Sequence, residues 1–411
     1  MSLFNILAIL LTLSALFSYI NFRYVRLPAA IGLMVIALVM SLALIGLSHV
    51  GIPLDESAEV LLHSIDLNET LLHGMLSFLL FAGALHIDLN DLAREKWVIS
   101  SLATGSVLIS TLVVGSLIYL LFGILGVPIR PIYAFLFGAL ISPTDPIAVL
   151  GILKSAGTSK RLEIKIAGES LFNDGVGVVV FVILLAMATG KESVTINTVV
   201  YLFVTEAVGG AVFGLGIGLI AYGMLRDVDN YNVEILITLA LVTGGYALAD
   251  MLHISGPIAI VVAGLLIGNH GRSFAMSDTT REHLDTFWEL LDEILNAVLF
   301  VLIGLEVLVL KFTPTYLIAG FIAIPTVLLA RFISVGVPVS LMRFFRDFTP
   351  NAVKIMTWGG LRGGISIALA LSLAPSVARD AIVSATYIVA VFSILVQGLT
   401  VSLFVRRWSQ A

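Results

Sequence analysis

The chain has 411 residues, of which 59% are hydrophobic and only 12% are charged, and its mean hydropathy is +1.08. About a quarter of the residues in an ordinary soluble domain are charged, so this composition excludes a soluble globular protein. The net charge of -5 gives no indication of nucleic-acid binding, and the absence of cysteine excludes disulfide bonds, thiol chemistry and cysteine metal sites.

Apolar segments long enough to cross a membrane recur along the whole chain. The first, Leu3 to Ile20, has neither a basic region before it nor an A-x-A site, so we expect a span and not a cleaved signal peptide. No linker or soluble domain interrupts the segments, and only Arg406–Ala411 follow the last, so we expect one transmembrane domain over residues 1–411 without a soluble regulatory domain. We predict an all-α polytopic membrane protein with about 13 spans, at residues 3–20, 28–47, 70–87, 98–122, 131–152, 163–188, 198–225, 233–252, 255–269, 286–310, 315–341, 352–374 and 381–404.

The distribution of basic residues predicts the orientation of these spans. Of the 22 Lys and Arg, 16 lie in odd-numbered connections or after the last span and only 4 lie in even-numbered connections. Because cytoplasmic loops carry the excess of Lys and Arg, we predict that the N-terminus lies outside and the C-terminus in the cytoplasm. We expect the protein in the inner (plasma) membrane of a bacterium or archaeon.

The fifth span is interrupted by "SPTDPIAVL", residues 142–150, in which Pro143 and Pro146 flank Asp145. Each proline lacks an amide hydrogen, so the carbonyls of Ala139 and Ser142 are expected to lose their helical donors. A proline kink would explain the prolines alone, but it does not require a carboxylate at mid-membrane, which costs roughly 3 kcal/mol or more. We therefore predict an unwound, functional break within residues 131–152.

The twelfth span, residues 352–374, contains a second break at "WGGLRGGISIAL", residues 358–369. Its four glycines loosen a helix through their backbone entropy, although close helix packing is an alternative reason for them. Arg362 lies among the glycines and needs an anionic partner or an electric field to balance its charge.

The two breaks occupy matching places if spans one to six and eight to thirteen form two six-helix repeats. These repeats are offset by seven spans, so the second enters the membrane from the opposite side. Interrupted helices at matching places in inverted repeats indicate a transporter with its substrate site near the membrane midplane.

The sixth span, residues 163–188, carries polar residues on one face. With 100° per residue, Glu169, Ser170, Asn173 and Asp174 fall within an arc of about 140°. Such a stripe must face protein or water. One acid can be explained by a structural ion pair, for which Arg331 in the eleventh span is the natural partner, and this leaves Asp174 as the freer acid. Glu206, Asp250 and Glu306 lie near predicted span ends, where snorkelling explains them, and no histidine cluster predicts a zinc site.

Together these motifs resemble the monovalent cation:proton antiporter family, on the side of the NhaP-type proteins and the eukaryotic sodium/proton exchangers. The resemblance covers nearly the whole chain and depends on Thr144-Asp145-Pro146, Glu169-Ser170 with Asn173-Asp174, Arg331, and Gly360-Leu361-Arg362-Gly363. It implies a homodimer in which a dimerisation domain carries a core domain with two crossing unwound helices that moves like an elevator. Members often carry an acid on the third span, where Ala82 stands in "FLLFAGAL".

The resemblance also implies the roles of individual residues. Asp174 would bind Na⁺ or H⁺, with Thr144, Asp145 and Ser170 completing the site, while Glu169 and Arg331 would form a structural ion pair. Asn173 stands where relatives that exchange more protons per cation have a second aspartate, so the resemblance suggests electroneutral exchange of one Na⁺ (or Li⁺) for one H⁺. No cofactor is expected besides the transported ions.

Three other functions are compatible with membrane-embedded acids. A K⁺/H⁺ antiporter or K⁺ efflux channel would use similar helices, and a carrier of organic solutes would need a larger polar pocket. An intramembrane aspartyl protease needs a G-x-G-D signature, whereas Asp145 follows Pro-Thr and Asp174 follows Phe-Asn.

Overall fold

The computed structural model describes residues 3–49, 74–145, 158–190, 195–272, 275–310, 313–346 and 348–409. These ranges are helical and contain no β-strand, apart from one isolated bridge between two residues. Eight of their helical segments are long and apolar enough to cross a membrane, and three shorter apolar helices accompany them. The all-α membrane architecture is thus confirmed for the described part of the chain, while the count of 13 crossings and the repeats stay predictions.

The helices follow the predicted spans closely, with ends that differ by a few residues. The main elements are α1 (Leu3–Ile20), α2 (Ala29–His49), α5 (Leu76–Leu85), α6 (Leu89–Arg94), α7 (Lys96–Ser100), α8 (Val107–Ile124), α9 (Pro131–Ile141), α11 (Lys160–Ala188), α12 (Ile196–Arg226), α13 (Tyr231–Met251), α14 (Gly256–Leu266), α16 (Asp278–Leu305), α17 (Pro314–Met342), α18 (Ala352–Trp358), α19 (Gly364–Leu371), α20 (Val377–Phe392) and α21 (Gly398–Ser409).

The largest difference is at α16, which begins eight residues before the span predicted at 286–310. The side chain of Ser277 caps the helix by accepting a hydrogen bond from the amide of Thr280. The added turns are polar, and a search for apolar runs cannot detect helical turns that continue beyond the hydrocarbon region.

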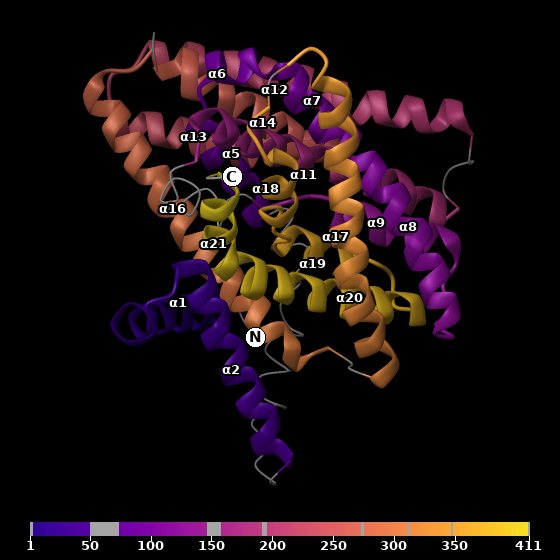
Figure 1. The fold of residues 1–411 in the computed structure, drawn as a ribbon. Helices are drawn as coiled ribbons and strands as arrows, with labels where there is room; N and C mark the ends of the chain where they lie inside the picture. The colour runs from indigo at the N-terminus through magenta and orange to yellow at the C-terminus, as the bar shows by residue number, and fades with distance from the viewer. Residues whose placement is uncertain are drawn as a thin grey trace.

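The three largest groups of buried apolar side chains among the described residues join helices that are distant in sequence; the arrangement of these helices is shown in Figure 1. One group joins α8, α9, α11, α17, α19 and α20, and a second joins α1, α2 and α16 to α19 and α20. A third joins α5, α12, α13, α14 and α16. Consequently α19, the second half of the interrupted twelfth span, contributes side chains to two of these three largest groups.

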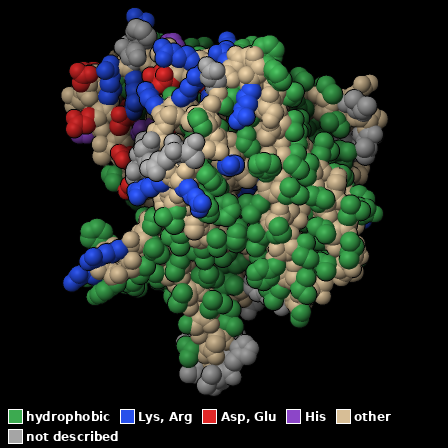
Figure 2. Space-filling view, in the orientation of Figure 1, with side chains coloured by type: hydrophobic (Ala, Val, Ile, Leu, Met, Phe, Trp, Pro, Cys, Tyr) green, Lys and Arg blue, Asp and Glu red, His purple; other side chains and the backbone are tan. Residues whose placement is uncertain are grey.

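The surface in Figure 2 separates charged from apolar side chains. Acidic and basic side chains gather mainly at the upper left of this view, over α6 and the beginning of α16, whereas hydrophobic side chains cover most of the face below. Exposed apolar side chains such as Leu219, Phe321 and Phe332 belong to helices that meet the membrane criteria. This division is expected when lipid surrounds the lower part.

Both predicted breaks are present. Helix α9 ends at Ile141, and residues 143–145 are not helical, while residues 146–152 of the predicted span lie outside the described part of the chain. Residues 359–363 separate α18 from α19. Asp145 and Leu361 form the isolated antiparallel bridge, so the two breaks meet at one point.

Candidate functional site

The two unwound segments are joined by backbone and side-chain hydrogen bonds. The amide of Asp145 donates to the carbonyl of Leu361 at 2.8 Å. A guanidinium nitrogen of Arg362 donates to the carbonyls of Ser142 at 2.5 Å and Pro143 at 2.9 Å. Pro143 cannot provide the helical donor to the Ala139 carbonyl, as expected, and the amide of Ser142 donates to this carbonyl instead, in a tighter final turn.

Arg362 therefore lies at the carbonyl end of α9. It is only 2% exposed, so its charge is removed from water. The C-terminus of a helix carries a partial negative charge, and a cation there is stabilised. This contact explains why a buried arginine follows the glycines: the electric field it requires comes from the broken helix α9.

Asp145 has the complementary position at the start of α19. A Cβ atom on Gly363, the residue before this helix, would come within 2.6 Å of the Asp145 carboxylate. An anion is favoured beside the positive end of a helix, which here is created by the break at residues 359–363. Each break thus leaves a helix end next to a charge that belongs to the other broken span.

Residues of α11 bind the first unwound segment through Thr144. Asn173 donates to the Thr144 hydroxyl at 2.9 Å and accepts from the Thr144 amide at 3.3 Å, and the Ser170 hydroxyl donates to the Thr144 carbonyl. Both side chains are buried. Predicted as ion ligands, Ser170 and Asn173 face Thr144 and fix its position.

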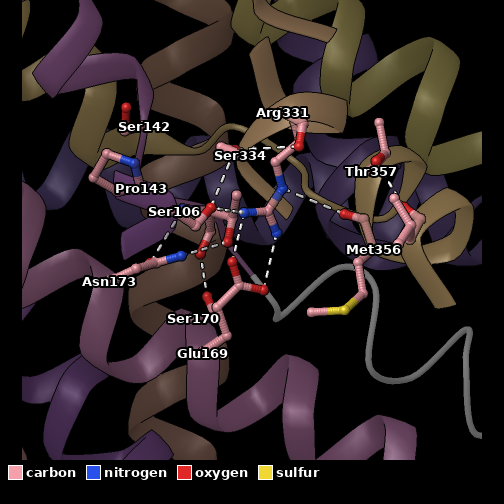
Figure 3. Close-up of polar contacts among 12 residues, drawn as sticks. Ser106, Ser142, Pro143, Glu169, Ser170, Asn173, Arg331, Ser334, Met356 and Thr357 are labelled. Carbon is pink, nitrogen blue, oxygen red and sulfur yellow. Dashed lines mark hydrogen bonds and ion pairs between the residues drawn. The ribbon is translucent and has the colours of Figure 1, made fainter. Parts of the chain in front are cut away.

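Glu169, on the same face of α11 as Ser170 and Asn173, forms a buried ion pair with Arg331 (Figure 3). The two guanidinium nitrogens lie 2.5 and 2.9 Å from the two carboxylate oxygens, and the side chains are only 4% and 1% exposed. Arg331 also donates to the Ser106 hydroxyl and the Met356 carbonyl, both at 3.4 Å. The pair expected from the sequence is present and links α11, α17, α18 and the turn before α8.

Asp174 differs from Glu169 because no cation neutralises it among the described residues. It is 6% exposed, and its Oδ1 atom is buried without a hydrogen-bond partner in the described part of the chain. A buried carboxylate oxygen without a partner is costly, so this atom is expected to bind a proton, a cation or water.

A cavity of about 520 Å³ reaches Asp174. Its inner wall includes Thr144, Asp145 and Asp174, and its outer residues include Asp88, Asp91, Lys160 and Glu163. Carboxylate, hydroxyl and carbonyl oxygens are hard ligands suited to a small hard cation. Of the predicted ion ligands, Thr144, Asp145 and Asp174 line this cavity, whereas Ser170 and Asn173 do not.

Sequence reasoning missed two polar residues of the cavity wall, Asp292 and Asn296 of α16. The signal was available, because Asp292 is an acid six residues inside the predicted span and such acids are rarely accidental. Ala82, where the third-span acid was sought, is buried, and the neighbouring Gly83 lines the cavity instead.

The contact between α11 and the unwound segment requires a glycine. A Cβ atom on Gly177 would lie 2.3 Å from Cγ of Pro143 and 3.0 Å from its Cδ. We expect Gly177→Ala to displace Pro143 and Thr144, to destabilise the protein by about 1–3 kcal/mol and to slow transport. The measurements are heat-induced unfolding in detergent and ion flux in proteoliposomes.

The control for this prediction is Gly216→Ala in α12, where an added Cβ meets nothing within 4 Å. Both changes replace a helical glycine by alanine, which by itself stabilises a helix by up to about 1 kcal/mol. Equal effects of the two substitutions would contradict the role given to Gly177.

Comparison with known proteins identifies the family of this chain. The family model described as "Sodium/hydrogen exchanger, transmembrane" matches residues 11–407. The chain is 52% identical over 408 residues to the Na⁺/H⁺ antiporter NhaP of Pseudomonas aeruginosa, covering 98% of this chain and 96% of that protein. It is 34% identical to the Na⁺/H⁺ antiporter NhaH of Halobacillus dabanensis, with 92% of each chain covered.

The fold is also similar to that of the sodium proton antiporter MjNhaP1 from Methanocaldococcus jannaschii. That structure has a TM-score of 0.77 at 21% identity, and the alignment covers 98% of both chains. At this identity the likeness concerns the fold alone, but the family model and the relatives cover the interrupted helices and the Asp174 helix. The chain belongs to the transmembrane sodium/hydrogen exchanger family.

Proposed function

We propose that this protein is a secondary active antiporter that exchanges Na⁺, with Li⁺ as a second possible cation, for H⁺ by alternating access. The observation that carries the proposal is the Asp174 carboxylate at the inner wall of an acidic cavity, which is buried and has no cationic partner among the residues that the structure describes. The names of the related NhaP and NhaH proteins support sodium and protons as the exchanged ions.

In this mechanism Asp174 holds either a proton or a cation, but not both. Thr144 and Asp145, which line the same cavity, supply further oxygens to the cation, and Ser170 and Asn173 hold Thr144 in position. Because the two ions compete for one carboxylate, exposing it alternately to the two sides of the membrane couples their movements in opposite directions. Glu169 and Arg331 act structurally, and Arg362 compensates the end of α9.

The oligomeric state, the membrane location and the orientation are proposed from the sequence and the resemblance. The protein works as a homodimer in a cell membrane, with the N-terminus outside and the C-terminus in the cytoplasm. In this orientation Asp88, Asp91, Lys160 and Glu163 lie on the cytoplasmic side, so the cavity they line admits ions from the cytoplasm.

Proton flux in proteoliposomes tests this function. The purified protein is reconstituted, an outward or inward gradient of Na⁺, Li⁺ or K⁺ is imposed in turn, and the internal pH is recorded with a trapped dye. Proton movement driven by Na⁺ or Li⁺ supports the proposal. Movement driven by K⁺ alone, or by none of the three, would overturn it.

The charge balance of the exchange gives a separate prediction. Asp174 is neutralised by one proton or one monovalent cation in each translocating state, and Asn173 is a neutral amide bound to Thr144. We therefore expect exchange to proceed at the same rate with and without a membrane potential. A potassium diffusion potential set with valinomycin provides the measurement, and acceleration or reversal of Na⁺/H⁺ exchange by that potential would show that a second acid joins the cycle.

A further inference from the structure

Helix α16 presents two polar side chains to the cavity, one helical turn apart. Asp292 and Asn296 are separated by four residues and therefore lie on the same face of the helix. Both line the cavity that reaches Asp174. Since α16 is neither of the interrupted helices and is not the Asp174 helix, the mechanism above assigns these side chains no role.

The amide of Asn296 is incompletely satisfied. Its nitrogen donates to the carbonyl of Asp292 in the same helix at 2.9 Å. Its Oδ1 atom is buried without a hydrogen-bond partner in the described part of the chain, and the residue is only 7% exposed. Buried amide oxygens almost always have a partner. A cation or a cation-bound water in the cavity would provide one.

The charges that line the cavity favour a cation. Asp88, Asp91, Asp145, Glu163, Asp174 and Asp292 contribute six carboxyl groups, whereas the basic side chains are Lys160 and His86. Lys160 lies 3.0 Å from Asp91 and is thereby balanced. At the mouth, the amides of Asn90 and Asp91 donate to the Asp88 carboxylate and lower its pKa, so this group remains ionised. Acidic clefts with apolar walls concentrate cations.

The position of Leu299 shows how far Asn296 lies from the point where the two unwound segments cross. Leu299, three residues later in α16, also lines the cavity and packs against Gly364 so closely that a Cβ atom there would collide with its side chain. Gly364 begins α19 and follows Gly363, which contacts Asp145. Asn296 therefore lies about one turn of helix from the level of Asp145 and lines the same cavity as Asp145 and Asp174.

We propose that Asp292 and Asn296 form a second binding site for a partly hydrated alkali cation, which holds the incoming Na⁺ before it reaches Asp174. The Asp292 carboxylate supplies the charge and Asn296 Oδ1 supplies a neutral oxygen. This site rests on the proposed function of the protein, because it loads the same ion. It raises the local concentration of Na⁺ without entering the exchange of ion for proton at Asp174.

Transport kinetics separate this role from that of Asp174. In proteoliposomes, Asp292→Asn is expected to raise the KM for Na⁺ about tenfold, through the loss of one carboxylate, while kcat stays within about twofold. Asn296→Leu should raise KM in the same direction. Glu293→Gln is the matched control, because Glu293 is the adjacent acid of α16 but is exposed and does not line the cavity. Its kinetics should equal those of the wild type.

Equilibrium binding of radiolabelled Na⁺ tests the site directly. Purified Asp174→Asn protein should still bind Na⁺, and the double variant Asp174→Asn/Asp292→Asn should bind none. A wild-type KM for Asp292→Asn, or identical binding by the single and double variants, would overturn the second site. If Asp292→Asn does not fold, Asn296→Leu tests the second site instead, through the KM for Na⁺ and through Na⁺ binding in the Asp174→Asn background. Failure of the main proposal looks different, because Asp174→Asn would then still transport.

Discussion

Replacing Asp174 by asparagine is expected to reduce Na⁺/H⁺ exchange to the proton leak of protein-free liposomes. Asparagine has nearly the same shape but neither binds a proton nor provides the negative charge that a cation requires. Asp174 is the acid of α11 whose Oδ1 is buried without a partner, so its substitution breaks no ion pair seen in the described residues. The measurement is the pH change inside proteoliposomes after a Na⁺ gradient is imposed.

The stability of Asp174→Asn distinguishes loss of the site from loss of the fold. Removing a buried carboxylate removes a desolvation cost, so the variant should unfold at the same temperature as the wild type or at a higher one. Exchange at the wild-type rate by the correctly folded variant would mean that another acid carries the ions. A fall in unfolding temperature together with lost exchange would instead place Asp174 among the structural residues.

The second large effect is expected at Glu169, and it concerns stability. Glu169→Ala leaves Arg331 charged in a position that is only 4% exposed. The remaining contacts, to the Ser106 hydroxyl and the Met356 carbonyl at 3.4 Å, are neutral and cannot replace a carboxylate. Losing one partner of a buried ion pair typically costs about 3–5 kcal/mol, so the variant should unfold at a clearly lower temperature.

Removing both charges should restore part of this loss. In the double variant Glu169→Gln/Arg331→Gln no ion remains buried at this place, and two amides of similar size can form hydrogen bonds to one another and to Ser106. Heat-induced unfolding of the two single variants and the double variant completes the cycle. A stable Glu169→Ala protein that binds no Na⁺ would contradict this account and make Glu169 an ion ligand.

The sequence determined the parts of the site that follow from the cost of polar groups in a membrane. Pro143 and Pro146 on either side of Asp145, and the glycines around Arg362, predicted two breaks because a continuous helix in hydrocarbon does not accommodate such residues. The polar arc of α11 follows from helical geometry alone, and the ratio of two acids to one arginine predicted that one acid has no arginine partner. The resemblance then assigned ion binding to Asp174 and the structural pair to Glu169. Apart from this assignment, these inferences need only the neighbours along the chain and the properties of the solvent.

The tertiary structure decided which groups meet across the chain. Arg362 lies at the carbonyl end of α9, and Asp145 lies at the start of α19, because the two unwound segments cross at the bridge between Asp145 and Leu361. Ser170 and Asn173 form hydrogen bonds with Thr144 and do not line the cavity, although the helix face on which they lie was predictable. That Asp292 and Asn296 line the cavity depends on the packing of α16 beside α19. Helical periodicity defines the face on which a side chain lies, but the partner opposite that face depends on the packing of distant segments, which no local pattern contains.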